Sequence, residues 1–137
     1  MQKENIYLNI NPEIVKLIIS SAREFQAKEG VTFPEEMASS EYEYDMWQIL
    51  ADHKDDLTFI ETKKMMRELD EDQKINLLAL MYLGRGDYDV NEWNAARKEA
   101  ENNLKPRLAE YLFSKPQLPE YLEEGLEALG YSLGDVE

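Results

Sequence analysis

Apolar residues recur at three- and four-residue intervals along most of the chain, which is the spacing of one face of an α-helix. The clearest example begins at Pro12, directly after the potential N-cap Asn11, and ends before the stop signal Gly30. This stretch contains several β-branched residues, which favour strands. The helical period over residues 12–29, between matching start and stop signals, outweighs them and predicts a helix.

The most apolar part of the chain lies near its middle. Asp70 and Gln73 form a capping-box pattern, and an uninterrupted apolar run follows at residues 77–83. Because this run consists mainly of the helix formers Leu, Ala and Met, it predicts a helix that is buried on every side rather than a strand. We predict this central helix over residues 71–84, ended by the glycines of Gly84-Arg85-Gly86.

Shorter amphipathic stretches predict further helices on both sides of the central one. The expected helices cover about residues 45–53, 56–69 and 90–104, a short stretch from Pro106, and a last stretch from Pro119 to a left-handed C-cap at Gly130.

The spacing of these elements predicts the architecture. Residues 30–45 contain several acids and no base, and we interpret them as a solvated loop. Connections elsewhere are short, and no pair of alternating segments suggests a β-hairpin. We therefore expect residues 1–137 to form a single all-α domain, an orthogonal bundle of about six helices around helix 71–84.

The amino-acid composition excludes several classes of functional site. The 137 residues include 29 Asp and Glu against 15 Lys and Arg, giving a net charge of −14, with one histidine and no cysteine. Thiolate nucleophiles and disulfides are excluded, and a single histidine cannot build a zinc site that needs two or three imidazoles. The negative charge disfavours binding to nucleic acid or anionic membranes, because both interactions depend on clustered Lys and Arg.

The start of the sequence shows neither the apolar core nor the cleavage site of a signal peptide. The longest apolar run, residues 77–83, is far below the ~20 residues that cross a bilayer. We therefore expect a soluble cytoplasmic protein.

Several short strings in the second half resemble one protein family. They are Leu69-Asp70-Glu71-Asp72-Gln73, Leu77-Leu78-Ala79-Leu80, Leu83-Gly84-Arg85-Gly86-Asp87, Glu92-Trp93, Glu110-Tyr111-Leu112 and Pro119-Glu120-Tyr121-Leu122. In this combination they are similar to the domain of unknown function 3775, a family of uncharacterised bacterial proteins. The resemblance covers roughly residues 8–130. It implies a helical, cytoplasmic, bacterial protein and assigns no catalytic residue.

One turn resembles a calcium-binding loop. Asp87, Asp89 and Asn91 occupy its first, third and fifth positions, between two predicted helices. The sixth position, however, is Glu92 instead of Gly, and the twelfth is Lys98 instead of a bidentate Glu. We therefore favour the interpretation that the two aspartates cap helix 90–104, with a metal site as the alternative.

Four other residues are candidates for binding. For Arg85 we favour a structural role, in which its guanidinium bridges carboxylates on neighbouring helices. The alternative is that it binds an anion or another ligand. The helical spacing of Trp93, Tyr111 and Tyr121 favours core positions, but such side chains near a surface would anchor a partner. His53 lacks the further histidines that a phosphohydrolase or di-iron site requires.

These features predict a non-catalytic module without a cofactor, which binds another protein or a second copy of itself in a groove between helix 90–104 and the C-terminal helices. Acidic and apolar helix faces suit a basic or amphipathic helical partner. The main alternative is a regulator that binds a divalent metal or a small ligand at residues 84–93. An enzyme that uses carboxylates and an acidic mimic of nucleic acid are weaker alternatives, because the sequence shows neither a nucleophile–base pair nor a concentrated acidic region.

Overall fold

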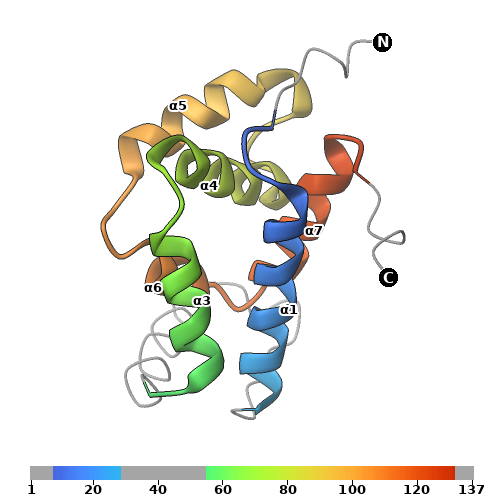
Figure 1. The fold of residues 1–137 in the computed structure, drawn as a ribbon. Helices are drawn as coiled ribbons and strands as arrows, with labels where there is room; N and C mark the ends of the chain where they lie inside the picture. The colour runs from blue at the N-terminus through green and yellow to red at the C-terminus, as the bar shows by residue number, and fades with distance from the viewer. Residues whose placement is uncertain (1–7, 29–54, 132–137) are drawn as a thin grey trace.

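The structure is a computed structural model that describes residues 8–28 and 55–131 (Figure 1). These residues form six α-helices and a short 3₁₀-helix, without a strand among them. The helices are α1 (Pro12–Lys28), α3 (Leu57–Arg67), α4 (Glu71–Arg85), η3 (Val90–Glu92), α5 (Trp93–Asn103), α6 (Leu108–Phe113) and α7 (Leu118–Ala128). The predicted all-α class is confirmed.

Helix α4 is the centre of the bundle. It packs against α5 on one side and α7 on the other, while α7 also packs against α1. Helices α4 and α5 lie side by side and run across the ends of α1 and α3, as Figure 1 shows. Residues 75–83 of α4 are all buried. The predicted central helix is confirmed, and it extends one residue beyond 84.

Local signals mark both ends of α4. The Asp70 side chain accepts a hydrogen bond from the Gln73 N–H at 2.8 Å, and the Gln73 side chain accepts one from the Asp70 N–H at 2.9 Å. This is the predicted capping box. At the other end Gly86 adopts a left-handed conformation with φ of 92°, which turns the chain out of the helix.

Within the predicted stop Gly84-Arg85-Gly86 it is Gly86 that ends the helix, whereas Gly84 has another role. It lies inside α4, where the helix backbone meets that of α7: a Cβ atom at Gly84 would be 1.7 Å from the Tyr121 carbonyl oxygen. Gly125 of α7 is the counterpart, since its Cβ would be 2.5 Å from the Leu80 carbonyl oxygen. The two glycines therefore allow a closer approach of two helices than any side chain would permit.

Three phenylalanines join helices that are distant in sequence. Phe25 of α1, Phe59 of α3 and Phe113 of α6 are buried, and their ring centroids lie 5.1–5.8 Å apart. Tilted ring pairs at this separation add to the stabilisation that burial gives. The cluster fixes α3 and α6 against the lower part of α1 in the view of Figure 1.

A buried asparagine holds the segment that precedes α1. The fully buried Asn76 accepts a hydrogen bond from the Asn9 backbone N–H at 3.0 Å and donates one to the Asp72 carbonyl oxygen at 2.8 Å. A buried amide is tolerated when its polar atoms are satisfied in this way. The neighbouring Leu8 and Ile10 thereby reach the core.

Several boundaries differ from the prediction. Residues 90–104 form a 3₁₀ turn followed by α5 rather than one helix, and the stretch predicted at 56–69 is helical only over Leu57–Arg67. The last helix begins at Leu118, one residue before Pro119, and Gly130 has the predicted left-handed conformation with φ of 99°. The expected helix 45–53, the acidic loop 30–45 and Gly30 lie outside the described residues, and the single domain over residues 1–137 stays a prediction.

Replacing Gly84 by Ala should lower the free energy of unfolding by about 3 kcal/mol, because the new methyl group overlaps the α7 backbone and the two helices must separate. Gly86→Ala is the control, since a Cβ there meets nothing within 4 Å and adds only left-handed strain, roughly 1 kcal/mol. Urea unfolding followed by circular dichroism measures both variants. Equal losses would contradict the close contact.

Candidate functional site

A cleft of about 390 Å³ opens where the C-terminal end of α4 meets α5 and α6. It lies in the region of the groove predicted between helix 90–104 and the C-terminal helices, but much of its lining comes from α4 and the following turn, and none from α7. The side chains that line it are mostly polar rather than apolar: Tyr82, Arg85, Asp87, Tyr88, Glu99, Asn103 and Tyr111. The cleft is large enough for a side chain of a partner or a small ligand.

One wall of the cleft is a hydrogen-bonded group from α4 and α5. The Asn103 amide donates to the Tyr82 hydroxyl oxygen at 3.1 Å and to a Glu99 carboxylate oxygen at 2.9 Å. Burial raises the pKa of the Tyr82 phenol, against the opposing effect of the hydrogen bond from Asn103. Tyr82 is therefore protonated at neutral pH, and Glu99 is held in place by a neutral donor.

Arg85 and Asp87 form an ion pair at the mouth of the cleft. Arg85 Nε and a terminal guanidinium nitrogen lie 2.8 and 2.7 Å from the same Asp87 carboxylate oxygen. Burial disfavours the charged guanidinium, but the hydrogen bond and the charge of Asp87 raise the pKa of Arg85 overall. The guanidinium carbon also lies 5.4 Å from the centre of the Tyr82 ring. The partner of Arg85 is thus a carboxylate in the adjoining turn, not one on a neighbouring helix as predicted.

The structure separates the predicted binding residues. Arg85 and Tyr111 line the same cleft. Trp93, in contrast, is only 4% exposed and belongs to the core, so it cannot anchor a partner at the surface. Tyr121 is half-buried against the core and is not among the residues that line the cleft.

In the turn that we considered as an alternative metal site, the carboxylates accept hydrogen bonds from neighbouring residues of the same turn. The Asp89 side chain accepts from the Val90 N–H at 2.8 Å, and Glu92 accepts from the Asp89 N–H at the same distance. Asp89 therefore caps η3 rather than α5 directly, while Asp87 pairs with Arg85 instead of capping. Asn91 is an exposed residue of η3. Within residues 8–28 and 55–131, no group of three or more His, Cys, Asp or Glu is placed to hold a metal ion.

Comparison with known proteins places the chain in a family. A family model described as a protein of unknown function, DUF3775, matches residues 60–131, more than half of the 137 residues. The chain belongs to the DUF3775 family. This confirms the resemblance noted in the sequence. No curated protein and no solved structure matches the chain. None of the described helices is long and apolar enough to cross a membrane.

The DUF3775 match includes every residue that lines the cleft, although sequence reasoning found only some of them. It missed Tyr82, Tyr88, Glu99 and Asn103. Glu99 and Asn103 are four positions apart and share one face of a helix, which was an available signal. Tyr82 gave no such signal, because it stands within an apolar run whose other members are all buried.

In the variant Tyr82→Phe, the free energy of unfolding should fall less steeply with rising pH in the alkaline range than it does in the wild type. Below the ordinary tyrosine pKa of 10.0 the phenol is neutral in both states, and above it the unfolded chain ionises first, so the free energy of unfolding falls until pH passes the raised folded-state pKa. Phenylalanine removes this contribution. Urea unfolding at a series of pH values between about 9 and 11 tests it, and parallel profiles for the two proteins would refute the raised pKa.

Proposed function

We propose that this DUF3775 protein is a non-catalytic interaction module of the bacterial cytoplasm, and that its cleft receives a basic side chain of a partner protein. The observation that carries the proposal is the lining of the cleft, which combines Tyr82, Tyr88 and Tyr111 with the carboxylate of Glu99. Aromatic faces together with a carboxylate attract a Lys or Arg side chain.

The charges in the cleft favour a cation. Arg85 is already neutralised by Asp87 at 2.7 Å, so Glu99 is left as the uncompensated charge among the lining residues. The Asn103 amide occupies one Glu99 oxygen, and the other oxygen can accept from a partner. Glu99 is exposed, so a partner can reach it without rearrangement of the helix.

The aromatic side chains supply the second attraction. The rings of Tyr82 and Tyr88 are tilted by 42° with centroids 6.2 Å apart, and both line the cleft. The Tyr82 ring is buried and already has the Arg85 guanidinium over it, so Tyr88 is the ring of this pair that a partner can reach. A cation placed over an aromatic face gains roughly 0.5–2 kcal/mol, depending on how far it is desolvated. The net charge of −14 would further accelerate the approach of a basic partner.

The alternative, a regulator that binds a divalent metal or a small ligand at residues 84–93, lacks a specific observation in its favour. The carboxylates that would bind a metal, those of Asp87 and Asp89, accept from Arg85 and from the Val90 N–H. The cleft geometry therefore supports the interaction module better.

A charge reversal in the cleft tests the proposal. We expect some members of a panel of amphipathic helical peptides to bind through a central Lys or Arg, and Glu99→Lys to weaken their binding about tenfold or more, since it replaces an attraction by a repulsion. Fluorescence anisotropy with labelled peptides gives the dissociation constants. Glu127→Lys is the matched control, because Glu127 is an exposed residue of α7 that does not line the cleft.

The control separates a site from a general charge effect. Equal weakening by Glu99→Lys and Glu127→Lys would show that the peptides respond only to the overall charge of the protein. Failure of every basic peptide to bind would also overturn the proposal. Binding that is unchanged when Ala replaces the central Lys or Arg would exclude a role for a cation in the cleft.

A further inference from the structure

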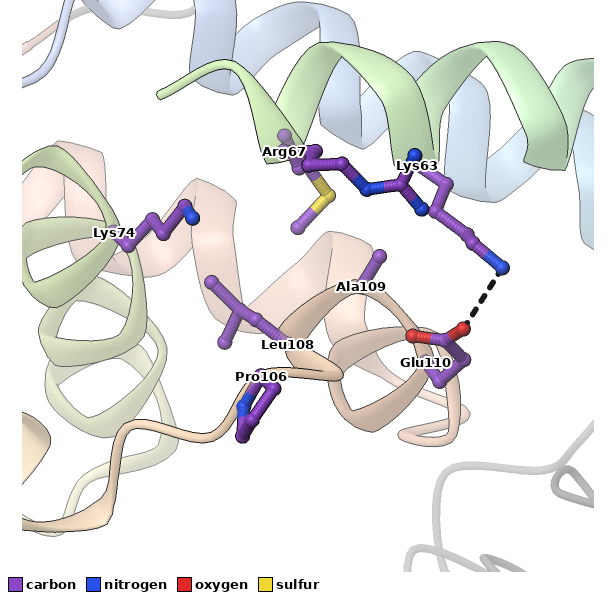
Figure 2. Close-up of a pocket in the computed structure, with 8 residues that line it drawn as sticks. Lys63, Arg67, Lys74, Pro106, Leu108, Ala109 and Glu110 are labelled. Atoms are coloured by element: carbon purple, nitrogen blue, oxygen red, sulfur yellow. Dashed lines mark ion pairs between the residues drawn. The ribbon is translucent and has the colours of Figure 1, made fainter. Parts of the chain in front are cut away.

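A small basic pocket lies on the α3 side of α6, apart from the cleft. It has a volume of about 40 Å³, and its walls come from α3, from α4 and from the segment that leads into α6. Figure 2 shows Lys74 reaching in from α4, Lys63 and Arg67 extending from α3, and Pro106 with Leu108 on the opposite side. Met66, Ala109 and Glu110 complete the lining.

The pocket concentrates positive charge in an acidic chain. Three cationic side chains line it, Lys63, Arg67 and Lys74, against the single carboxylate of Glu110. Lys63 lies 3.0 Å from Glu110, so this pair is mutually compensated (Figure 2). Within the described part of the chain, neither Arg67 nor Lys74 has an ion pair. Among the described residues, two cations of the pocket are therefore left without a counter-charge.

Glu110 is committed to holding Lys63. Its burial alone would favour the neutral acid, but the hydrogen bond and charge of Lys63, with a contribution from Arg107, lower the pKa of Glu110 overall. The carboxylate is thus ionised at neutral pH and fixes one edge of the pocket. Arg67 and Lys74 remain available for a ligand.

Lys74 enters the pocket from the start of α4, whose first turn also contains the acids Glu71 and Asp72. It is the fourth residue of α4, close to the helix N-terminus, where the N–H groups carry partial positive charge. Arg67, in the last turn of α3, lines the same pocket, and its guanidinium lies on the Lys63 side (Figure 2). An anion in the pocket would offset the excess of positive charge in its lining.

We propose that this pocket binds the phosphoryl group of a small phosphate compound. A volume of about 40 Å³ holds roughly three water-sized groups, which suits an anionic head rather than a whole metabolite. The long side chains of Arg67 and Lys74 both line the pocket, and each can turn its charged end toward an anion bound there. Apolar contacts from Met66, Pro106 and Leu108 would then face the ester substituent. This site is independent of the cleft and of its basic partner.

Titration with inorganic phosphate and with phenyl phosphate tests the proposal. We expect saturable binding by calorimetry at neutral pH and low ionic strength, weakened about tenfold or more in Arg67→Gln/Lys74→Gln, since two charge-assisted contacts are lost. The matched control is Lys64→Gln/Lys98→Gln, which removes the same net charge from two exposed lysines outside this pocket. The control should retain wild-type affinity within about twofold.

The two ligands distinguish the source of the phosphoryl group. Tighter binding of phenyl phosphate would identify a phosphate ester that uses the apolar wall, and equal affinities would identify free phosphate, both of which support the site. Absence of saturable binding by either ligand would overturn it. Equal weakening in the two double variants, or the same response to chloride at matched ionic strength, would do so as well.

The stability of the variants in phosphate-free buffer is a second check. Because Arg67 and Lys74 have no ion pair within the described residues, Arg67→Gln/Lys74→Gln should unfold at a temperature no lower than Lys64→Gln/Lys98→Gln. A markedly lower unfolding temperature would assign these cations a purely structural role and contradict the proposal.

Discussion

The contact between the backbones of α4 and α7 is the constraint on which the rest of the fold depends. Gly84 and Gly125 leave no side chain between the two helices, and the carbonyl groups of Tyr121 and Leu80 occupy the space where a Cβ would stand. Helix α7 then supports α1, α1 supports α3, and α3 supports α6. The arrangement is thus a chain of helix contacts that begins at the central helix, and a shift of α7 would pass to every later member.

The end of α4 places the cleft in the same way. Because Gly86 turns the chain directly after Arg85, the following residues return along α4 and bring Asn103 of α5 back to Tyr82 at 3.1 Å. This wall of the cleft is therefore built from the C-terminal parts of α4 and α5, which are separated in sequence by the turn and by η3. Its rigidity comes from the buried α4, so Glu99 is presented by elements that are held by packing rather than by a free loop.

Structural features that depend on a few adjacent residues could be predicted from the sequence. Features that depend on contacts between residues distant in sequence could not. The capping box of Asp70 and the left-handed Gly130 depend on a few adjacent positions, and both predictions are confirmed. Gly84-Arg85-Gly86 was correctly predicted to end the helix, but the packing role of Gly84 was missed, because a glycine for a turn and a glycine for close packing look alike until the opposing helix is known. The helical spacing of Trp93 favoured the core position that the structure shows, but a surface anchor stayed open as the alternative, since spacing alone does not show which face meets the core.

Helix α6 separates surfaces of opposite chemistry. Its residues Glu110 and Tyr111 are adjacent, and adjacent residues of a helix point about 100° apart. Glu110 consequently faces Lys63 on α3, whereas Tyr111 lines the cleft beside Glu99. One short helix can therefore border a cleft suited to cations and a pocket suited to anions. The chain has 29 acidic and 15 basic side chains, and Lys74 has no ion pair within the described residues, so the pocket differs in charge from the protein as a whole.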